Sequence, residues 1–401
     1  MRAEGGASSG SPVRVLWAVV AVLALSGCAT ETERRADSLA AAYRFISDYH
    51  VSQVDSAALY RAAMEGMLAD LDDPYTRHLS AEKLAVWREE DARYGAVGAV
   101  VWAEAGREGG PVAVTEVRPG GPAERAGVRP GDVLVPALEE ERPLVVDWRI
   151  RGPVGRRYRF RWVRPAAGWS RRLELGCRDL GPPRVARRWL SDRIALVEVP
   201  RCAPRTPRRL KRALEAATAE EMRGLVLDLR ANGGGRLKAA ARMCDLFLPD
   251  GTAFQTDGRR EELRETYRTG APTAVPPELP MAVLVDGRTA SAAEVVAGAL
   301  QARGRAVLVG TRTFGKGRGT VTFELPDETG LLVAVLSTEL HDAGAIEGRG
   351  LTPDVHVGAP VRFPEPDAPL RNWVWFPAYR RSREQQVEAA VGMVRERMGT
   401  R

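Results

Sequence analysis

The spacing of apolar residues changes along the 401-residue chain, and each change predicts a different kind of structure. Between about 37 and 87 the apolar residues recur every three or four positions, as on one face of a helix. Between about 93 and 165 short apolar runs are separated by glycine turns, which favours strands. From about 183 to 360 apolar runs alternate with amphipathic segments, and 383–398 has the spacing of a final helix. The pattern therefore predicts helices, then a small β-rich part, then a larger α/β part.

The strands predicted in the α/β part are apolar on both faces. They comprise residues 193–199, 224–230, 281–286 and 306–310, and helical patterns occupy 206–221, 236–248 and 292–304. Such strands are buried on both sides, so we expect a sheet that helices cover on both faces. Residues 320–338 predict a β-hairpin around the turn "PDETG".

The first 28 residues have the pattern of an export signal. Arg14 precedes an apolar run, 15–25, which is too short to span a bilayer. The following "LSGC" resembles the bacterial lipoprotein signal, which implies that Cys28 is lipidated and becomes the mature N-terminus. We therefore expect a lipid-anchored protein of the bacterial cell envelope that faces the periplasm, with residues 29–36 as a polar tether. An ordinary signal peptide with an incidental cysteine is the alternative.

Composition narrows the classes of partner. The apolar and charged fractions, 44% and 28%, are those of a globular protein, and the net charge of +7 comes from scattered arginines. The basic cluster at 201–212 is interpreted as a solvated helix face, because no nucleic-acid motif accompanies it. No spacing of Cys, His or carboxylates resembles a metal site, and no cofactor is implied. Cys244 is expected in the core, whereas a disulfide between Cys177 and Cys202 stays open.

The β-rich part resembles a PDZ domain of the bacterial type. Gly95–Val101 followed by "VRPGGPAERAGVRPGDVLV" carries this resemblance. It implies a loop at Val97, Gly98 and Ala99 that binds a peptide's C-terminal carboxylate, while the peptide adds as a strand to the sheet edge. The family usually has a helix as the second wall of the groove. Residues 135–150 are short and β-like here, so we expect the groove to be incomplete.

Three segments of the α/β part are candidates for chemistry. A glycine loop ends "VLDLRANGGG" at 226–235, where backbone N–H groups before a helix can bind an anion. Ser291 begins a helix after a buried strand, where it is either a nucleophile or an ordinary N-cap. The segment "GTRTFGKG" at 310–317 nearly matches a phosphate-binding loop. It lacks the Ser or Thr after Lys316, and a hairpin follows instead of a helix, which argues against a nucleotide.

Lys316 can instead serve as a general base. The pKa of a lysine, about 10.4 in water, must then fall towards neutrality, and burial of an unpaired amine can lower it that far. A neutral amine can take the proton of a serine hydroxyl. A Ser–His–Asp arrangement using His341 or His356 is the competing interpretation.

Six segments in order give a closer resemblance. They are "DPYTRHLS", the PDZ-like segment, "LVLDLRANGGG", "DLFLPDG", "TASAAEVVAGALQARGRAVLVGTRTFGKG" and "GRGLTPDV". Together they resemble the carboxyl-terminal processing proteases, or tail-specific proteases, over nearly all of the chain after Cys28. The resemblance implies a ClpP/crotonase-like α/β protease domain in which Ser291 is the nucleophile and Lys316 the general base. It also implies an oxyanion hole at the backbone N–H groups of Gly234 and Ala292.

The chain departs from that family at the fourth residue after the lysine. The family usually has a glutamine there that orients the lysine, and this chain has Thr320, whose single hydroxyl makes it a lysine-orienting candidate. Gly233 stands where many members have proline. Thr320 is expected to affect how Lys316 is positioned. Neither Thr320 nor Gly233 removes a group that transfers a proton.

The resulting hypothesis is a serine endopeptidase that cleaves exported proteins near C-terminal tails. The predicted parts are a signal peptide 1–28, a helical domain 29–90, a PDZ-like domain 91–168, a Ser–Lys protease core 169–365 and a C-terminal helical segment 366–401. Expected partners are protein substrates and a membrane, not nucleic acid, and the oligomeric state stays open. The alternative is a weak or inactive adaptor that binds tails without cutting them.

Overall fold

The computed structural model describes residues 30–88, 95–102, 111–137, 144–146, 148–270, 272–341, 343–358 and 375–399. It divides into two units, 1–72 and 73–401. The predicted signal peptide and Cys28 lie outside the described residues. Within the described residues, no helix combines the length and the apolar character that crossing a membrane requires.

The first unit contains two helices, α2 (Glu31–Tyr49) and α3 (Ser56–Ala69). The Tyr43 hydroxyl joins them by donating to the Ser56 carbonyl at 3.0 Å. Helix α2 begins inside the segment predicted as a polar tether, so that prediction is wrong from Glu31 onward. The reason is a capping box, in which Thr30 Oγ1 accepts from the Glu33 N–H and the Glu33 carboxylate accepts from the Thr30 N–H.

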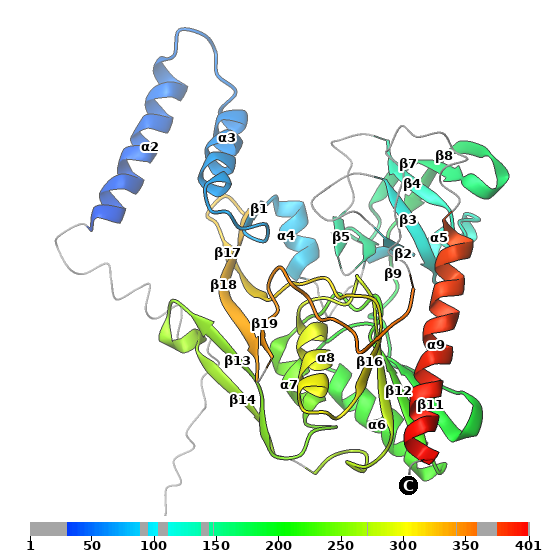
Figure 1. The fold of residues 1–401 in the computed structure, drawn as a ribbon. Helices are drawn as coiled ribbons and strands as arrows, with labels where there is room; N and C mark the ends of the chain where they lie inside the picture. Colours follow the sequence, from blue (N-terminus) through cyan, green and yellow to red (C-terminus); the bar gives the residue numbers. More distant parts are fainter. Residues whose placement is uncertain are drawn as a thin grey trace, which may run out of the picture. The chain divides into compact units, whose positions relative to one another are not determined.

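A six-stranded sheet forms the centre of the second unit (Figure 1). Its order is β10 (Ala186–Trp189), β11 (Ile194–Glu198), β12 (Gly224–Asp228), β15 (Met281–Val285), β16 (Val307–Gly310) and β20 (Val355–His356), parallel from β11 onward. Alternate residues of β11 face opposite layers. Ala195 packs with α6 (Thr206–Ala219), α7 (Leu237–Cys244) and α8 (Ala292–Ala302), whereas Ile194 packs with α9 (Phe376–Gly399). Helices therefore cover both faces, as the apolar strands predicted.

A second sheet extends from this core. It contains β1 (Arg77–Leu79), β13 (Gly251–Gly258), β14 (Glu265–Thr269), the hairpin of β17 (Arg318–Glu324) and β18 (Gly330–Leu340), and β19 (Gly344–Ala345). Strand β1 pairs antiparallel with β18, and α4 (Ala81–Arg88) follows it. The segment from Asp73 onward therefore belongs to the second unit, whereas the sequence predicts a helical domain that continues to residue 90.

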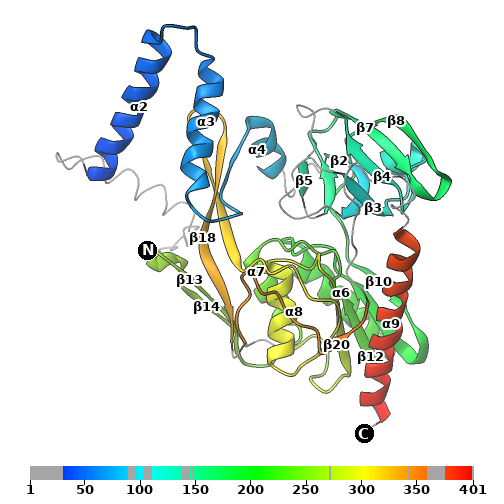
Figure 2. The same ribbon diagram turned by 45° about the horizontal axis from the view of Figure 1, so that its top comes forward.

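The PDZ-like part is an eight-stranded sheet, which Figure 2 shows beside the start of α9. Its strands are β2 (Gly95–Trp102), β3 (Val112–Val117), β4 (Val133–Pro136), β5 (Leu144–Val146), β6 (Arg149–Arg151), β7 (Arg157–Arg164), β8 (Trp169–Gly176) and β9 (Arg178–Asp179), with the short helix α5 (Pro122–Arg125). Val97, Gly98 and Ala99, predicted as a carboxylate-binding loop, lie inside β2 and are not in a loop.

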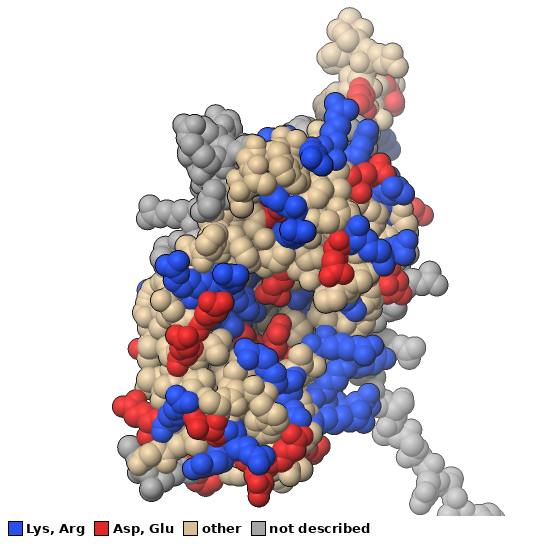
Figure 3. Space-filling model, turned by 90° about the vertical axis from the view of Figure 1, so that its right-hand side faces the viewer, with Lys and Arg blue, Asp and Glu red and all other residues tan. Residues whose placement is uncertain are grey.

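Cysteines and surface charge behave as ordinary packing and solvation predict. Cys244 is buried in the core, as expected. Cys177 lies in the core of the PDZ-like part and Cys202 in the core of the α/β part, and both are free thiols, so no disulfide joins them. On the face shown in Figure 3, Lys and Arg side chains are interspersed with Asp and Glu, as on a solvated surface.

Candidate active site

Ser291 lies on a strained turn between β15 and α8. Its backbone angles, φ 55° and ψ −125°, lie in a region that costs a non-glycine residue about 1–3 kcal/mol. Hydrogen bonds to the loop after β12 hold the turn. The Thr289 hydroxyl donates to the Leu229 carbonyl at 2.9 Å, and the Ala290 N–H donates to the Asn232 carbonyl at 2.9 Å. The residues directly before Ser291 are buried and Ser291 itself is partly exposed. Such a strained strand-to-helix turn is the geometry that presents a nucleophile.

The glycine loop packs directly on this turn. A Cβ atom on Gly234 would lie 2.7 Å from the Ala290 carbonyl oxygen, 2.9 Å from Ser291 Cβ and 3.0 Å from the Ala292 nitrogen. The φ of Gly234 is +95°, which also favours glycine. Only glycine lets the two backbones approach this closely.

The two N–H groups predicted to form the oxyanion hole lie close together, but they differ in whether they already donate a hydrogen bond. The Gly234 N–H donates to Asn232 Oδ1 at 2.9 Å. The Ala292 N–H, at the start of α8, has no hydrogen-bond acceptor within the described part of the chain. In this structure, therefore, one donor already has a partner, and the other lies at the positive end of a helix dipole.

Glu294 joins the serine turn to the lysine loop. Its side chain is fully buried, and its Oε2 accepts from the N–H groups of both Ser291 (2.8 Å) and Lys316 (2.9 Å). Its Oε1 accepts from the Thr313 hydroxyl (2.6 Å) and the Gly315 N–H (2.7 Å). Burial raises the pKa of this carboxyl, and the four hydrogen bonds act in the opposite direction. One carboxylate thus brings the backbones of Ser291 and Lys316 within two hydrogen-bond lengths of each other.

The side chain of Lys316 lies against an aromatic ring. Its Nζ is 4.8 Å from the centroid of the Tyr75 ring. Burial lowers the pKa of Lys316, and the Arg77 cation lowers it further, while Glu347 and Asp73 oppose the change. Burial also raises the pKa of Tyr75 to about 12, so its hydroxyl is neutral near pH 7. The surroundings of Lys316 therefore favour the neutral amine that a general base requires.

Among the described residues, no hydrogen bond joins the other predicted participants to Lys316. Thr320 lies on β17 opposite Ala334, and the described residues show no hydrogen bond between its hydroxyl and Lys316. Nor do they show one between the Ser291 hydroxyl and Lys316. His341 is exposed after β18, and His356 lines a cavity of about 250 Å³ whose described lining includes neither Ser291 nor Lys316.

Sequence reasoning missed two residues of this site. Glu294 reads as one position of an apolar helix, although the spacing Ser-x-x-Glu at 291–294 is the signal of a capping box and could have identified it. Tyr75 lies more than two hundred residues before Lys316, on the segment leading into β1. Its proximity depends on the pairing of β1 with β18, which no local pattern reveals.

Comparison with known proteins shows which families the parts of this chain resemble. Residues 193–357 match the model of peptidase family S41, 24–83 match the activating protease CtpB N-terminal domain, and 113–135 match a PDZ domain. The α/β domain of the chain is therefore similar to peptidase family S41. The predicted fold class, an α/β protease domain with a PDZ domain and a helical N-terminal part, is confirmed.

Relatives and solved structures support the same family. A carboxy-terminal-processing protease of Bartonella bacilliformis is 38% identical over 35% of this chain and 32% of its own length. Carboxy-terminal processing protease CtpA of Bacillus subtilis is 26% identical over 85% and 73%. The solved photosystem II D1 C-terminal processing protease is 25% identical with a TM-score of 0.55, covering 84% of this chain and 95% of its own. The match spans only about a third of the Bartonella protein and of the similar Synechocystis protease.

Replacing Glu294 with glutamine should disrupt the site. In either orientation of the glutamine amide, its NH₂ group replaces one of the two carboxylate oxygens. At least one backbone N–H that now donates to that oxygen then loses its acceptor. Each unsatisfied buried donor costs about 1–3 kcal/mol. We expect Glu294→Gln to lower kcat at least about tenfold and to lower Tm. The matched control is Glu215→Gln, an exposed carboxylate 3.8 Å from Lys211 on α6. Equal kcat values for the two variants would contradict this role of Glu294.

Proposed function

We propose that the protein is a serine endopeptidase in which Ser291 is the nucleophile and Lys316 the general base. The observation that carries this proposal is the shared hydrogen bonding of the two backbones to Glu294. The strained turn at Ser291 and the lowered pKa of Lys316 support it. The match of residues 193–357 to peptidase family S41 supports the reaction class.

In the proposed reaction, neutral Lys316 takes the Ser291 proton as the hydroxyl oxygen attacks the scissile carbonyl. The lysine, now an ammonium, gives this proton to the departing amine, and an acyl-enzyme remains. Water then attacks the ester, and Lys316 accepts its proton and returns one to Ser291. Each proton that the lysine takes is given back, so the enzyme is regenerated.

The developing oxyanion would be stabilised at the start of α8. The Ala292 N–H is proposed as one donor and the Gly234 N–H as the other. For Gly234 to contribute, its N–H must exchange Asn232 Oδ1 for the substrate oxygen. The negative charge of the intermediate favours this exchange, because an ionised acceptor makes a stronger hydrogen bond than an amide oxygen.

We propose unfolded or flexible exported proteins as substrates, cut near their C-terminal tails. Several relatives carry the name carboxyl-terminal processing protease, which supports this choice. The lipoprotein-like segment ending at Cys28 supports an anchored location in the cell envelope. Two or more acyl chains would hold such a protein on a membrane stably.

The dyad is tested with an unfolded protein substrate and purified protein lacking residues 1–29. We expect cleavage by the parent, and loss of at least about a thousandfold in kcat for both Ser291→Ala and Lys316→Ala. His341→Ala and His356→Ala serve as controls and should cut at the parent rate. Loss of activity in a histidine variant, with Lys316→Ala still active, would contradict the assignment. Binding without cleavage by the parent would favour the adaptor alternative.

The pKa of Lys316 predicts the pH dependence. Because only the neutral amine accepts a proton, kcat/KM should fall as the pH drops through the Lys316 pKa, which burial and Arg77 hold below about 10.4. Arg77→Gln removes a cation, so the Lys316 pKa should rise and the acidic limb should move to higher pH. The control is Arg172→Gln, which changes an exposed residue of β8. An acidic limb that stays in place in Arg77→Gln would exclude this electrostatic effect.

Lipidation is tested by expressing the full chain in a bacterial host with labelled palmitate. We expect the parent to carry the label and to sediment with membranes. The Cys28→Ser variant should lose the label and leave the membrane fraction. A label that persists in Cys28→Ser would refute the site, and an unlabelled parent would indicate an ordinary signal peptide.

A further inference from the structure

The edge of the PDZ sheet where a peptide would add is already filled by this chain. Strand β2 has β3 on one side and β6 on the other. On the β6 side Arg149 lies opposite Val100 and Arg151 opposite Ala96, antiparallel. The Val101 N–H donates to the Trp148 carbonyl at 2.7 Å, and the Gly152 N–H donates to the Gly95 carbonyl at 3.1 Å. Residues 148–152 therefore take up hydrogen bonds that a bound tail would otherwise make.

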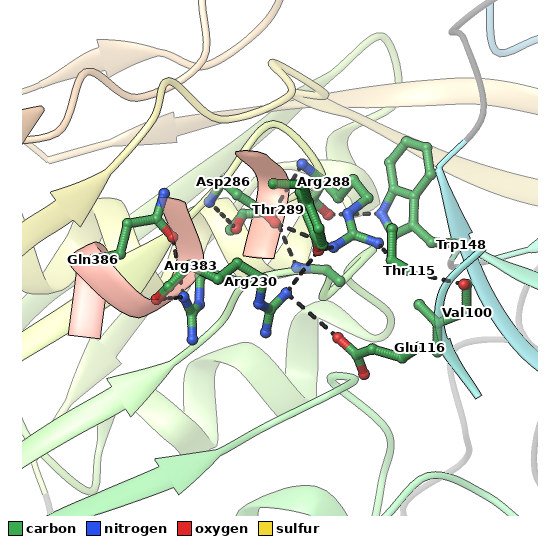
Figure 4. A network of polar contacts seen from close by, with 12 residues as sticks. Val100, Thr115, Glu116, Trp148, Arg230, Asp286, Arg288, Thr289, Arg383 and Gln386 are labelled. Carbon is green, nitrogen blue, oxygen red and sulfur yellow. Dashed lines mark hydrogen bonds and ion pairs between the residues drawn. The ribbon is translucent and has the colours of Figure 1, made fainter. Parts of the chain in front are cut away.

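The first residue of this segment also contacts the candidate active site. The Trp148 indole N–H donates to the Arg288 carbonyl at 2.7 Å, three residues before Ser291 (Figure 4). Its ring packs edge-on against Phe314, with centroids 5.7 Å apart, two residues before Lys316. The Phe314 N–H in turn donates to the Thr289 carbonyl at 3.0 Å. One side chain from the PDZ sheet thus contacts both loops of the proposed dyad.

Arg288 strengthens the same junction from the protease side. Its side chain is fully buried and donates to the Thr115 hydroxyl of β3 at 2.9 Å and to the Tyr379 hydroxyl of α9. Asp286, which forms an ion pair with Arg288, also accepts from the N–H of Ala231 in the loop after β12 at 3.0 Å. In Figure 4, Asp286 and Arg288 lie between Thr115 on one side and Arg383 and Gln386 of α9 on the other. A movement of the PDZ edge would therefore be transmitted to the turn that holds Ser291.

We propose that residues 148–152 act as a built-in ligand of the PDZ domain and that Trp148 is a positioning residue for the dyad. This inference rests on the proposed peptidase function. The PDZ domain then holds the two catalytic loops in place without a bound peptide, and it does not capture substrate tails at this edge. Substrates would be selected at the protease domain alone.

The positioning role is tested with two variants of Trp148 and a fluorogenic peptide substrate. Trp148→Phe keeps an aromatic ring beside Phe314 but loses the N–H donor to Arg288. We expect its kcat to fall about fivefold, as for one lost hydrogen bond, with KM within twofold and Tm lowered by no more than a few degrees. Trp148→Ala should lose more, so that phenylalanine rescues part of the rate. Rates are normalised to the fraction of Ser291 that a fluorophosphonate titrates.

The matched control is Trp169→Phe. Trp169 is a partly buried tryptophan of β8, and its recorded ring contacts, with Trp162, Arg164 and Arg171, all lie in the PDZ sheet. It should leave kcat unchanged. An unchanged kcat in Trp148→Phe would overturn the positioning role. The positioning role would also be overturned if the lower kcat of Trp148→Phe returned to the parent value once it was divided by the fraction of titratable Ser291. The lower rate would then reflect misfolded protein alone.

The built-in ligand is tested without relying on activity, by hydrogen exchange in Ser291→Ala. The probe is a ten-residue unstructured peptide ending in Leu-Ala-Ala with a free carboxylate, and its amidated form is the control. We expect slow exchange at the Val101 and Gly152 N–H groups, unchanged by either peptide. Fast exchange in the free protein, or exchange that changes only with the free carboxylate, would show that a tail can occupy the edge. An inactive parent with these N–H groups protected would overturn the proposed function and leave the built-in ligand standing.

Discussion

The arrangement of the site depends on one buried carboxylate. Glu294 accepts four hydrogen bonds, one from the turn that carries Ser291 and three from the loop that carries Lys316. A carboxylate without partners at this depth would be strongly destabilising, so the two loops must stay closed around it. The strain at Ser291 is maintained by the same closure, because the turn cannot relax without giving up its bond to Glu294.

The rest of the second unit supports this closure from three directions. The glycine loop after β12 lies against the serine turn, where a single added methyl group would collide with its backbone. The β1 segment brings Tyr75 over the amine of Lys316. From the PDZ-like part, Trp148 contacts Arg288 before the serine turn and Phe314 within the lysine loop. In the proposed site, a serine turn and a lysine loop are in this way held close together without a histidine.

Much of this fold could be predicted from local patterns, and the parts that could not depend on distant pairing. Apolar strands such as 281–285 and the hairpin of β17 and β18 follow from periodicity and turn residues. The positions of Ser291, Lys316 and Gly234 followed from resemblance and from their places at strand ends. Tyr75 and Trp148 could not be found from such local patterns. Tyr75 reaches the site because the strand that follows it, β1, pairs with β18 far along the chain. Trp148 directly precedes β6, whose pairing with β2 contains a shift in register. Thr320 is predicted to orient Lys316, but the described residues show no hydrogen bond between them. The aromatic ring beside the Lys316 amine is that of Tyr75.

The central claim is that Ser291 is a nucleophile activated by Lys316. The most direct measurement is mass spectrometry of the intact protein after treatment with a fluorophosphonate, followed by peptide mapping. The account predicts a single adduct on Ser291 whose rate of formation falls as the pH drops and is lost in Lys316→Ala. An adduct on another residue, or labelling of Ser291 at an undiminished rate in Lys316→Ala, would contradict it.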